Sequence, residues 1–381
     1  MVDSKNTIRV CIVGVGNCAS AIIQGVTKSK SEKYYKQMEG ITFESIGGYK
    51  VQDIEFVGAY DVDSRKVGKG LGQAIFSKPN CCMVLHDCKE DESLNKVKVK
   101  LGPRFDGVAK HMEGEDGFLP LQDNWDVFQI KDDLKIIKPD VIINYLPVGS
   151  QLATEFWALI CIDLKIPFLN CIPVFIASNP EWETKFVQAG IPLIGDDMRS
   201  QFGASVLSQM LQELALDRGH QVKCHIQQNS GGNTDFYNMM DKQRLQSKKI
   251  SKENVLKAPH ELLNKDSSES FMFAGPSDYI PYLEDQKVAT IHMELMGFGG
   301  APVKLDARLS VQDSPNSAGV VIDAIRFLKV AHECKLTGAL VGASAFTQKS
   351  PPRQLLFRDA LFECQQLAQR KLTSLTLAQT L

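Results

Sequence analysis

One stretch near the N-terminus decides the fold: Ile8-Arg9-Val10-Cys11-Ile12-Val13-Gly14-Val15-Gly16-Asn17-Cys18-Ala19-Ser20. Its first six residues are mostly apolar and β-branched, which predicts a strand, and residues 21–26 predict a helix. A glycine turn between them is typical of the first unit of a dinucleotide-binding sheet. Gly14 would permit the tight turn, Gly16 would let a pyrophosphate approach the backbone, and Ala19 holds the third small position. Asn17 and Cys18 are expected to contact the cofactor beside them.

The same turn can simply join a strand to a helix, so a second sign is needed. Residues 53–60 predict a second strand that ends in Asp61. An acid there would accept hydrogen bonds from the adenosine ribose and would repel the extra phosphate of NADP. We therefore expect NAD, although Arg65 and Lys66 leave NADP open. Asp61 arrives later than the usual spacing, so residues 28–52 are interpreted as an insertion.

Further strands follow with the same form. Residues 141–144, 167–173 and 191–197 are short apolar runs that end in turn residues, and residues 153–164 have helical character between the first two. Asn179-Pro180 is typical of a helix N-terminus. Strands that alternate with helices predict an α/β fold with a Rossmann-like, doubly wound parallel sheet, in which ligands bind beyond the carboxyl ends of the strands.

Composition narrows the range of partners. A chain of 381 residues is long enough for two domains, and its net charge of -2 gives no electrostatic footprint for nucleic acid or an anionic membrane. The first residues lead straight into a strand and no apolar run could span a bilayer, so we expect a cytoplasmic protein that binds small molecules. The ten cysteines lack zinc-type spacing, which predicts reduced, mostly buried thiols and no metal site.

The second half of the chain has a different pattern. Residues 222–228, 287–296 and 303–311 alternate as strands do, which predicts a second α+β domain with an antiparallel or mixed sheet. Such open sheets often pair across subunits, so a homo-oligomer is expected. Residues 320–333 predict an amphipathic helix.

Polar clusters in this half admit two interpretations. Ser200, Gln201 and Ser205 precede or open an apolar helix, where they could bind a phosphate, or Ser200 could merely cap that helix. Lys248 and Lys252 would share a helical face, or they could belong to a solvated stretch before a helix capped by Ser251. Asp235 could likewise be only a turn residue beside glycines.

An ordered series of motifs resembles the myo-inositol 1-phosphate synthase family, particularly its compact prokaryotic form, over most of the chain. The similarity includes the glycine turn and the following segments: Tyr60-Asp61-Val62-Asp63, Tyr145-Leu146-Pro147-Val148-Gly149-Ser150, Ile172-Pro173-Val174-Phe175-Ile176-Ala177, Gly195-Asp196-Asp197, Gly231-Gly232-Asn233-Thr234-Asp235-Phe236, Ser247-Lys248-Lys249-Ile250-Ser251-Lys252, Gly275-Pro276-Ser277-Asp278 and Asp313-Ser314-Pro315-Asn316-Ser317-Ala318-Gly319. The resemblance implies a redox-neutral cyclisation of glucose 6-phosphate, in which NAD oxidises C5, an enolate closes on the C1 aldehyde and the ring ketone is reduced.

The resemblance also implies roles for individual residues. The catalytic group would comprise Lys248, its partner Asp235, Lys287 and Lys349. Phosphate binding would fall to Lys252 with Ser200, Gln201 and Ser205, although this loop departs from the longer eukaryotic form. Further cofactor contacts would come from Leu146, Pro147, Asp197 and Asp313. Converging lysines suit chemistry in which negative charge develops on substrate oxygens.

The resemblance further implies that the C-terminal segment packs back on the nucleotide-binding part. We therefore expect residues 1–199 and 311–381 to form the NAD-binding domain, residues 200–310 the catalytic and oligomerisation domain, and the assembly to be a homotetramer. Two other functions stay open. A simple NAD-dependent sugar-phosphate dehydrogenase would accumulate NADH, and a non-catalytic NAD-binding regulator would leave glucose 6-phosphate unchanged.

Overall fold

The structure is a computed structural model that describes residues 7–31, 38–122, 124–241, 244, 246–275 and 278–372, with the backbone alone for residues 246–249. Its larger sheet has seven strands in the order β11-β6-β5-β4-β1-β2-β3, and every pair is parallel. The strands are β1 Ile8–Val13, β2 Ile54–Asp61, β3 Val99–Leu101, β4 Val141–Asn144, β5 Phe168–Asn170, β6 Pro192–Ile194 and β11 Gly338–Ala339. This confirms the doubly wound parallel sheet. Strand order reverses at β1, which places a ligand crevice at its carboxyl end.

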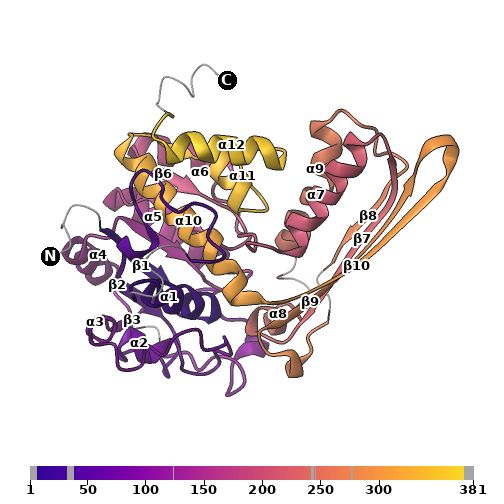
Figure 1. Cartoon of the computed structure of the whole chain (residues 1–381). Coiled ribbons are helices and arrows are strands. Elements are labelled where there is room, and N and C mark those ends of the chain that lie inside the picture. The colour runs from indigo at the N-terminus through magenta and orange to yellow at the C-terminus, as the bar shows by residue number, and fades with distance from the viewer. Residues whose placement is uncertain are drawn as a thin grey trace.

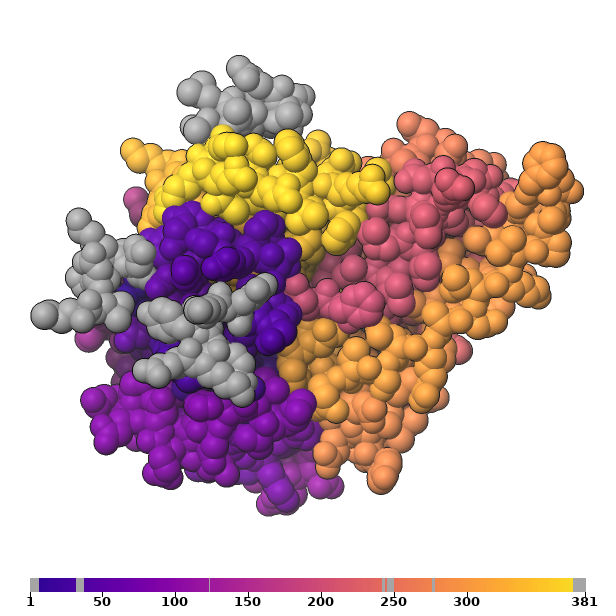
Figure 2. All heavy atoms as spheres, viewed as in Figure 1, coloured from indigo at the N-terminus to yellow at the C-terminus, as the bar shows by residue number. Residues whose placement is uncertain are grey.

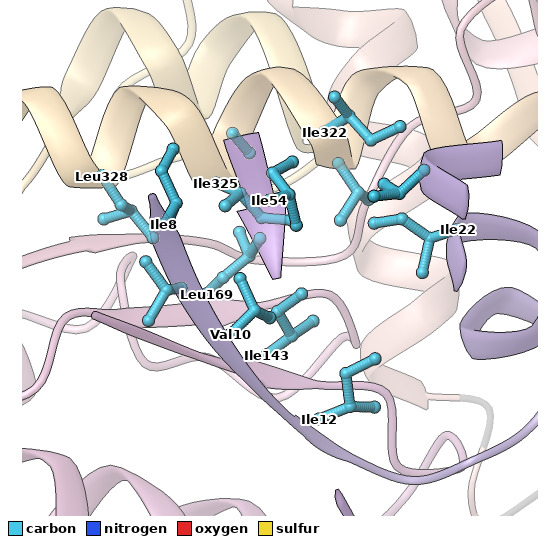
Figure 3. Packing of buried hydrophobic residues seen from close by; sticks show 14 of the residues in the cluster. Ile8, Val10, Ile12, Ile22, Ile54, Ile143, Leu169, Ile322, Ile325 and Leu328 are labelled. Atoms are coloured by element: carbon cyan, nitrogen blue, oxygen red, sulfur yellow. The ribbon is translucent and has the colours of Figure 1, made fainter. Parts of the chain in front are cut away.

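Alternation along the strands gives this sheet two apolar faces. Ile8, Val10 and Ile12 of β1 belong to one buried cluster, whereas Cys11 and Val13 belong to the other. Successive side chains of a strand point to opposite faces, so β1 contributes to both cores. Figure 3 shows the first cluster, in which strand side chains meet the apolar side of a long helix.

Helices cover both faces of the sheet (Figure 1). One face carries α1 Asn17–Ser29 and α10 Asp313–Glu333, which pack against each other. The opposite face carries α4 Val127–Ile137, α5 Gln151–Leu164 and α6 Pro180–Ala189. Asn179 Oδ1 accepts a hydrogen bond from the Glu181 amide at 2.9 Å, which confirms the predicted start of α6.

Helix α10 differs from its prediction as an amphipathic helix over residues 320–333. It begins seven residues earlier, at Asp313, and is buried along most of its length. The reason is its central place, since it contacts α1, the sheet, α11 Val341–Thr347 and α12 Phe357–Ala368. The fully buried Arg326 donates to Phe43 O at 2.8 Å and pairs with Asp323. Part of the predicted insertion therefore packs on α10.

The second sheet has four strands in the order β10-β9-β7-β8. Its strands are β7 Gln221–Gly231, β8 Phe271–Ala274, β9 Gln286–Met296 and β10 Pro302–Gln312. The β7–β9 and β9–β10 pairs are antiparallel and the β7–β8 pair is parallel, which confirms a mixed sheet. Helices α7 Ala204–Asp217 and α9 Gln246–Leu262 pack together beside it (Figure 1).

The second sheet joins the nucleotide-binding half where β10 continues into α10. In Figure 2 the orange segment, which includes β10 and the start of α10, lies beside the indigo and purple segments of the nucleotide-binding half. The remaining helices are short: α2 Leu71–Ala74, α3 Glu92–Lys96 and α8 Thr234–Asn238. Within the described ranges, none of the helices combines the length and apolarity needed to cross a membrane.

Candidate active site

A single cavity extends from the glycine turn after β1 to a group of lysines carried by the second sheet and the C-terminal segment. Its nucleotide end is lined by Gly14, Gly16, Asn17, Cys18, Asp61, Tyr145, Leu146 and Pro147. Its other end is lined by Asp197, Ser200, Ser205, Asp235, Lys252, Lys287, Asp313 and Lys349. Most of the residues predicted for the cofactor and for the substrate therefore share one space.

The glycine turn has the geometry that its sequence predicts. Gly14 has φ of 91°, and a Cβ on it would lie 2.7 Å from Tyr145 O, so a side chain is excluded there. Gly16 precedes α1 without a side-chain cap, and a Cβ on it would meet no atom within 4 Å. The first amides of α1 therefore open toward the cavity, where they can bind an anion.

Asp61 supports the turn in a way that the sequence did not reveal. Its Oδ2 accepts a hydrogen bond from the Val15 amide at 2.7 Å, and its Oδ1 accepts from the Val62 and Asp63 amides at 2.7 and 2.9 Å. The carboxylate is thus fixed at the end of β2, beside the glycine turn. A carboxylate has about four acceptor sites, so capacity remains for ribose hydroxyls.

Of the two cations near Asp61, Arg65 pairs with Asp63, whereas Lys66 Nζ lies 4.0 Å from Asp61 Oδ2. Arg65 donates to both oxygens of Asp63, at 2.9 and 2.6 Å. Lys66 is fully buried and donates to Val15 O at 2.8 Å and to Asn80 Oδ1 at 3.0 Å. Burial lowers the pKa of Lys66, and the nearby carboxylate of Asp61 opposes that shift. Arg65 is therefore held by Asp63, whereas Lys66 lines the cavity next to Asp61, so these cations leave NADP open.

Of the other residues predicted to contact the cofactor, Asn17 and Cys18 line the cavity and Ala19 does not. Asn17 lines the cavity, but its Oδ1 accepts from the Cys81 amide at 2.8 Å and so also holds a neighbouring loop. Burial raises the pKa of Cys18 to about 12, which keeps this thiol neutral. Ala19 is buried in the core, and it is absent from the described residues that line the cavity.

Two buried hydroxyls give an independent indication of a ligand. Tyr60 and Tyr145 line the cavity beside the glycine turn, and their Oη atoms have no hydrogen-bond partner among the described residues. A buried polar atom without a partner is costly, and a bound polar ligand can satisfy it. Together with the open amides of α1, these groups fit a dinucleotide.

At the lysine end, Lys349 and Asp197 form an ion pair. Lys349 Nζ donates to Asp197 Oδ1 at 2.8 Å and to Met198 O at 2.7 Å. Asp197 Oδ2 accepts from the Ser251 hydroxyl at 2.7 Å, and only 3% of Asp197 is exposed. Asp197 was predicted at the cofactor, but its carboxylate is directed to a lysine and a serine.

A second ion pair joins Lys287 to Asp313. Lys287 Nζ lies 3.1 Å from Asp313 Oδ1, and Asn233 Nδ2 donates to Asp313 Oδ2 at 3.4 Å and to Asp285 Oδ1 at 3.1 Å. Ser314 Oγ donates to Asp285 Oδ1 at 2.7 Å. Burial raises the pKa of Asp285 to about 6, and the Ser314 hydrogen bond opposes part of that shift.

Asn233 also connects this pair to Asp235. Its Oδ1 accepts hydrogen bonds from the Asp235 and Phe236 amides at 3.1 and 3.3 Å, so it caps α8. Asp235 lies in the first turn of that helix and lines the cavity. It is therefore a helical residue, and the interpretation of it as a turn residue is wrong.

Lys252 lies over the second sheet. Only 6% of Lys252 is exposed, and its Nζ donates to Gly275 O at 3.4 Å. Asn229 Nδ2 donates to the same carbonyl at 2.9 Å, and Gln227 Nε2 donates to Asn229 Oδ1 at 3.2 Å. Buried amides of β7 thus hold the carbonyl that binds Lys252.

Lys248 lies in α9, but its side chain is outside the described residues. The helical backbone over 246–262 agrees with the prediction that residues 248 and 252 share a helix face. Ser251 lies inside this helix, so the interpretation of Ser251 as its N-cap is wrong.

The predicted phosphate loop divides into two parts. Ser200 and Ser205 line the cavity, and α7 is capped by Gly203 without a side-chain hydrogen bond. Ser200 is therefore not the N-cap, and the first amides of α7 stay available. Gln201 is absent from the described lining residues. Its Nε2 instead donates to Thr42 Oγ1 at 2.6 Å, which fastens the loop to the segment before β2.

Known proteins resemble this chain over more than nine-tenths of its length. An inositol-3-phosphate synthase from Mycobacterium tuberculosis is 41% identical over 353 residues, which cover 93% of each chain. One from Corynebacterium glutamicum is 42% identical over 357 residues, which cover 92% of this chain and 95% of the relative. The chain belongs to the inositol-3-phosphate synthase family.

Two further similarities agree with membership in the inositol-3-phosphate synthase family. The family described as Myo-inositol-1-phosphate synthase matches residues 203–314, which include all four strands of the second sheet and the start of α10. The crystal structure of a myo-inositol-1-phosphate synthase-related protein from Thermotoga maritima has a TM-score of 0.76, is 24% identical, and covers 95% of this chain and 98% of that one. This structural similarity concerns the fold.

Several polar residues of this family member were missed by sequence reasoning. Arg199 is buried, and its Nε donates to Gln348 O at 2.6 Å beside Lys349, while burial lowers its pKa to about 10. Asn233 lies inside a motif of the resemblance, two residues before Asp235, and Asp285 lies two residues before Lys287, so their polarity beside these residues was the available signal. Ser251 was interpreted only as a cap and Ser350 was not singled out, because their partners lie 54 and 99 residues away.

Proposed function

We propose that the protein is an inositol-3-phosphate synthase that cyclises glucose 6-phosphate without net redox change. The observation that supports this most strongly is the shared cavity, in which a glycine turn lies in one space with Lys252, Lys287 and Lys349. These lysines come from α9, β9 and the segment after α11. A dinucleotide site joined to several cations suits redox chemistry on a phosphorylated polyol.

The proposed cofactor is NAD. Gly14, Gly16 and the first amides of α1 would hold its pyrophosphate, Asp61 would accept from the adenosine ribose, and Asp313 would lie toward the nicotinamide. Bound NAD supplies a hydride acceptor for the C5 hydrogen of the substrate and a hydride donor for the ring ketone. Leu146 and Pro147 would contribute apolar contacts along the same wall.

The lysines would hold and move protons at the substrate oxygens. Lys349 Nζ donates to Asp197 Oδ1 and to Met198 O, which fixes the position of its ammonium group at the cavity. Lys287 is oriented by Asp313 in the same manner. Such fixed ammonium groups would stabilise the oxyanion of an enolate and of the closing aldehyde. Lys248, with Asp235, would transfer the proton at the C5 hydroxyl.

Phosphate binding would involve both a lysine and a helix N-terminus. Lys252, Ser200 and Ser205 line the cavity at the start of α7, where the first amides have no side-chain cap. A dianionic phosphate is favoured by an ammonium group and by the positive end of a helix dipole. The predicted role of Gln201 lacks this support, because its side chain donates to Thr42 Oγ1 and its amide donates to Asn316 O at 2.6 Å.

We propose a homotetramer in the cytoplasm, with residues 1–199 and 311–381 as the NAD-binding domain and residues 200–310 as the catalytic and oligomerisation domain. Support for the division comes from the two sheets, because β7–β10 lie between residues 221 and 312.

Phosphorus NMR of the protein with glucose 6-phosphate and catalytic NAD tests the proposal, with NADH absorbance followed in parallel. We expect a new secondary phosphate ester and no build-up of NADH. Steady NADH accumulation would instead favour a simple dehydrogenase. Unchanged glucose 6-phosphate beside well-bound NAD would favour a binding protein or another sugar-phosphate substrate.

A further inference from the structure

Ser251 lies within the lysine-bearing helix α9 and is completely buried. It follows Lys248 by three residues and precedes Lys252, so it shares a helix turn with both. Its Oγ donates to Asp197 Oδ2 at 2.7 Å and accepts from Ser350 Oγ at 2.9 Å. Both partners belong to the segments that carry the Asp197–Lys349 pair.

This hydrogen-bonding pattern differs from that of three other helical hydroxyls and resembles that of Ser314 in α10, whose Oγ donates to the distant carboxylate of Asp285 at 2.7 Å. The three others bond within their own helices. Ser29 Oγ donates to Val26 O at 2.7 Å, Thr27 Oγ1 to Ile23 O at 2.8 Å and Thr347 Oγ1 to Ala343 O at 2.6 Å. Each of these bonds stays within its own helix, which is the common local choice for Ser and Thr. Ser251 instead bonds a carboxylate 54 residues away.

The partner of Ser251 is the carboxylate that orients a lysine. Asp197 Oδ1 accepts from Lys349 Nζ at 2.8 Å while Oδ2 accepts from Ser251. The backbone around them is also paired, since the Lys349 amide donates to Asp197 O at 2.7 Å. Rotation of the Asp197 carboxylate would therefore displace both the lysine and the serine.

We propose that Ser251 is a positioning residue that fixes helix α9 against the Asp197–Lys349 pair. It acts through Asp197, because it holds one carboxylate oxygen so that the other stays directed at Lys349. This inference rests on the proposed function, in which Lys349 and the α9 lysines act on one substrate. A hydrogen bond to a charged group between two such segments orients both.

The Ser251→Ala variant tests this role against Ser29→Ala, which removes an equally buried hydroxyl from α1, far from the lysine end of the cavity. We expect kcat of Ser251→Ala to fall by about tenfold, as loss of a hydrogen bond to a charged group typically gives. The KM for glucose 6-phosphate and the NAD affinity should match wild type. A structural role alone would lower the melting temperature of both variants and leave kcat per folded protein unchanged.

Competitive labelling of lysines with acetic anhydride, read by mass spectrometry, provides a second readout that needs no substrate. Lys349 of Ser251→Ala should be labelled several-fold faster than in wild type, with Lys287 as the internal reference. Equal labelling of Lys349 in Ser251→Ala and Ser29→Ala would overturn the proposal, as would unchanged kcat. If wild type did not convert glucose 6-phosphate, the proposed function would fail, and the labelling would still decide the role of Ser251.

A second variant covers the case in which Ser251→Ala does not fold. Ser350→Ala removes the donor to Ser251 Oγ and leaves the bond from Ser251 to Asp197 in place. It should change kcat and Lys349 labelling in the same direction by a smaller factor. No change in either quantity would contradict the proposal.

Discussion

The two ends of the cavity are built in different ways. The nucleotide end uses backbone amides and strand termini that are close in sequence or adjacent in the sheet, such as Gly14, Gly16 and the end of β2. The lysine end gathers Lys252, Lys287 and Lys349 from segments far apart in the chain. Buried carboxylates, amides and hydroxyls orient these lysines. The nucleotide end therefore depends on local backbone geometry, whereas the lysine end depends on hydrogen bonds between residues far apart in the chain.

The largest expected effect is a loss of turnover at the lysine end of the cavity without a loss of NAD affinity at the nucleotide end. Lys287→Ala should lower turnover of glucose 6-phosphate by about 10²- to 10³-fold, the usual loss when one donor to a developing oxyanion is removed. NAD affinity should stay near wild type in a fluorescence titration. Lys304→Ala is the matched control, because Lys304 is an exposed lysine of β10 paired with Glu294 at 2.7 Å. Normal turnover in Lys287→Ala would remove Lys287 from the mechanism.

A change at the glycine turn should primarily weaken NAD binding, in contrast to Lys287→Ala. Gly14→Ala places a methyl group 2.7 Å from Tyr145 O at φ of 91°, so we expect NAD affinity to fall by more than about tenfold and the melting temperature to drop. Gly68→Ala is the control, because Gly68 also has positive φ, 85°, but a Cβ there meets no atom within 4 Å. Equal NAD affinity in the two variants would mean that contact with Tyr145 is unimportant.

Replacing Asp61 should weaken NAD binding at the nucleotide end of the cavity, but by less than Gly14→Ala does. Asp61→Ala removes the acceptor for the Val15 amide and the proposed ribose contact, so we expect NAD to bind about tenfold more weakly. Turnover at saturating NAD should be close to wild type. Asp53→Ala, just before β2, serves as the control, because Asp53 accepts from the Lys50 amide and is not among the described residues that line the cavity. Unchanged NAD affinity in Asp61→Ala would place the ribose elsewhere.

The smallest expected effect concerns stability of the second sheet at acid pH. His225 of β7 is fully buried, and burial lowers its pKa from 6.5 to about 4, with His260 adding to the shift. Between these values the unfolded state binds more protons than the folded state. This contribution is therefore constant above pH 6.5 and becomes destabilising as pH falls through 6.5 toward 4.

Urea unfolding at neutral pH and at one pH unit below 6.5 measures this contribution. Wild type should lose about 1 kcal/mol more between the two conditions than His225→Leu, which has no titrating group at this position. An identical pH dependence in both proteins would show that His225 is protonated equally in the folded and unfolded states.

The nucleotide half could be predicted from sequence because its signals are local. The run Ile8–Val13, the glycines after it and Asp61 at the end of β2 each occupy the predicted place. The start of α10 was missed by seven residues, since Asp313–Gly319 has the composition of a turn and becomes helical through burial between α1 and the second sheet. Tertiary packing overrode local preference there.

At the lysine end, only residues within motifs were accessible to sequence reasoning. The motifs pointed to Lys252, Lys287 and Lys349, but the orientation of each depends on a partner distant in sequence. The resemblance implied that Asp197 contacts the cofactor. Its contacts with Lys349 and Ser251 arise only when α9 and the C-terminal segment fold onto β6. A single sequence carries no record of such pairings.

The most direct test of the account follows the C5 hydrogen of the substrate. Glucose 6-phosphate deuterated at C5 is incubated with the protein and catalytic NAD, and the product is analysed by NMR and mass spectrometry. The account predicts that the deuterium is retained on a ring carbon of the inositol phosphate, because the hydride removed at C5 is returned within the same cavity. Loss of the label to water, or its accumulation in NADH, would contradict the redox-neutral cycle.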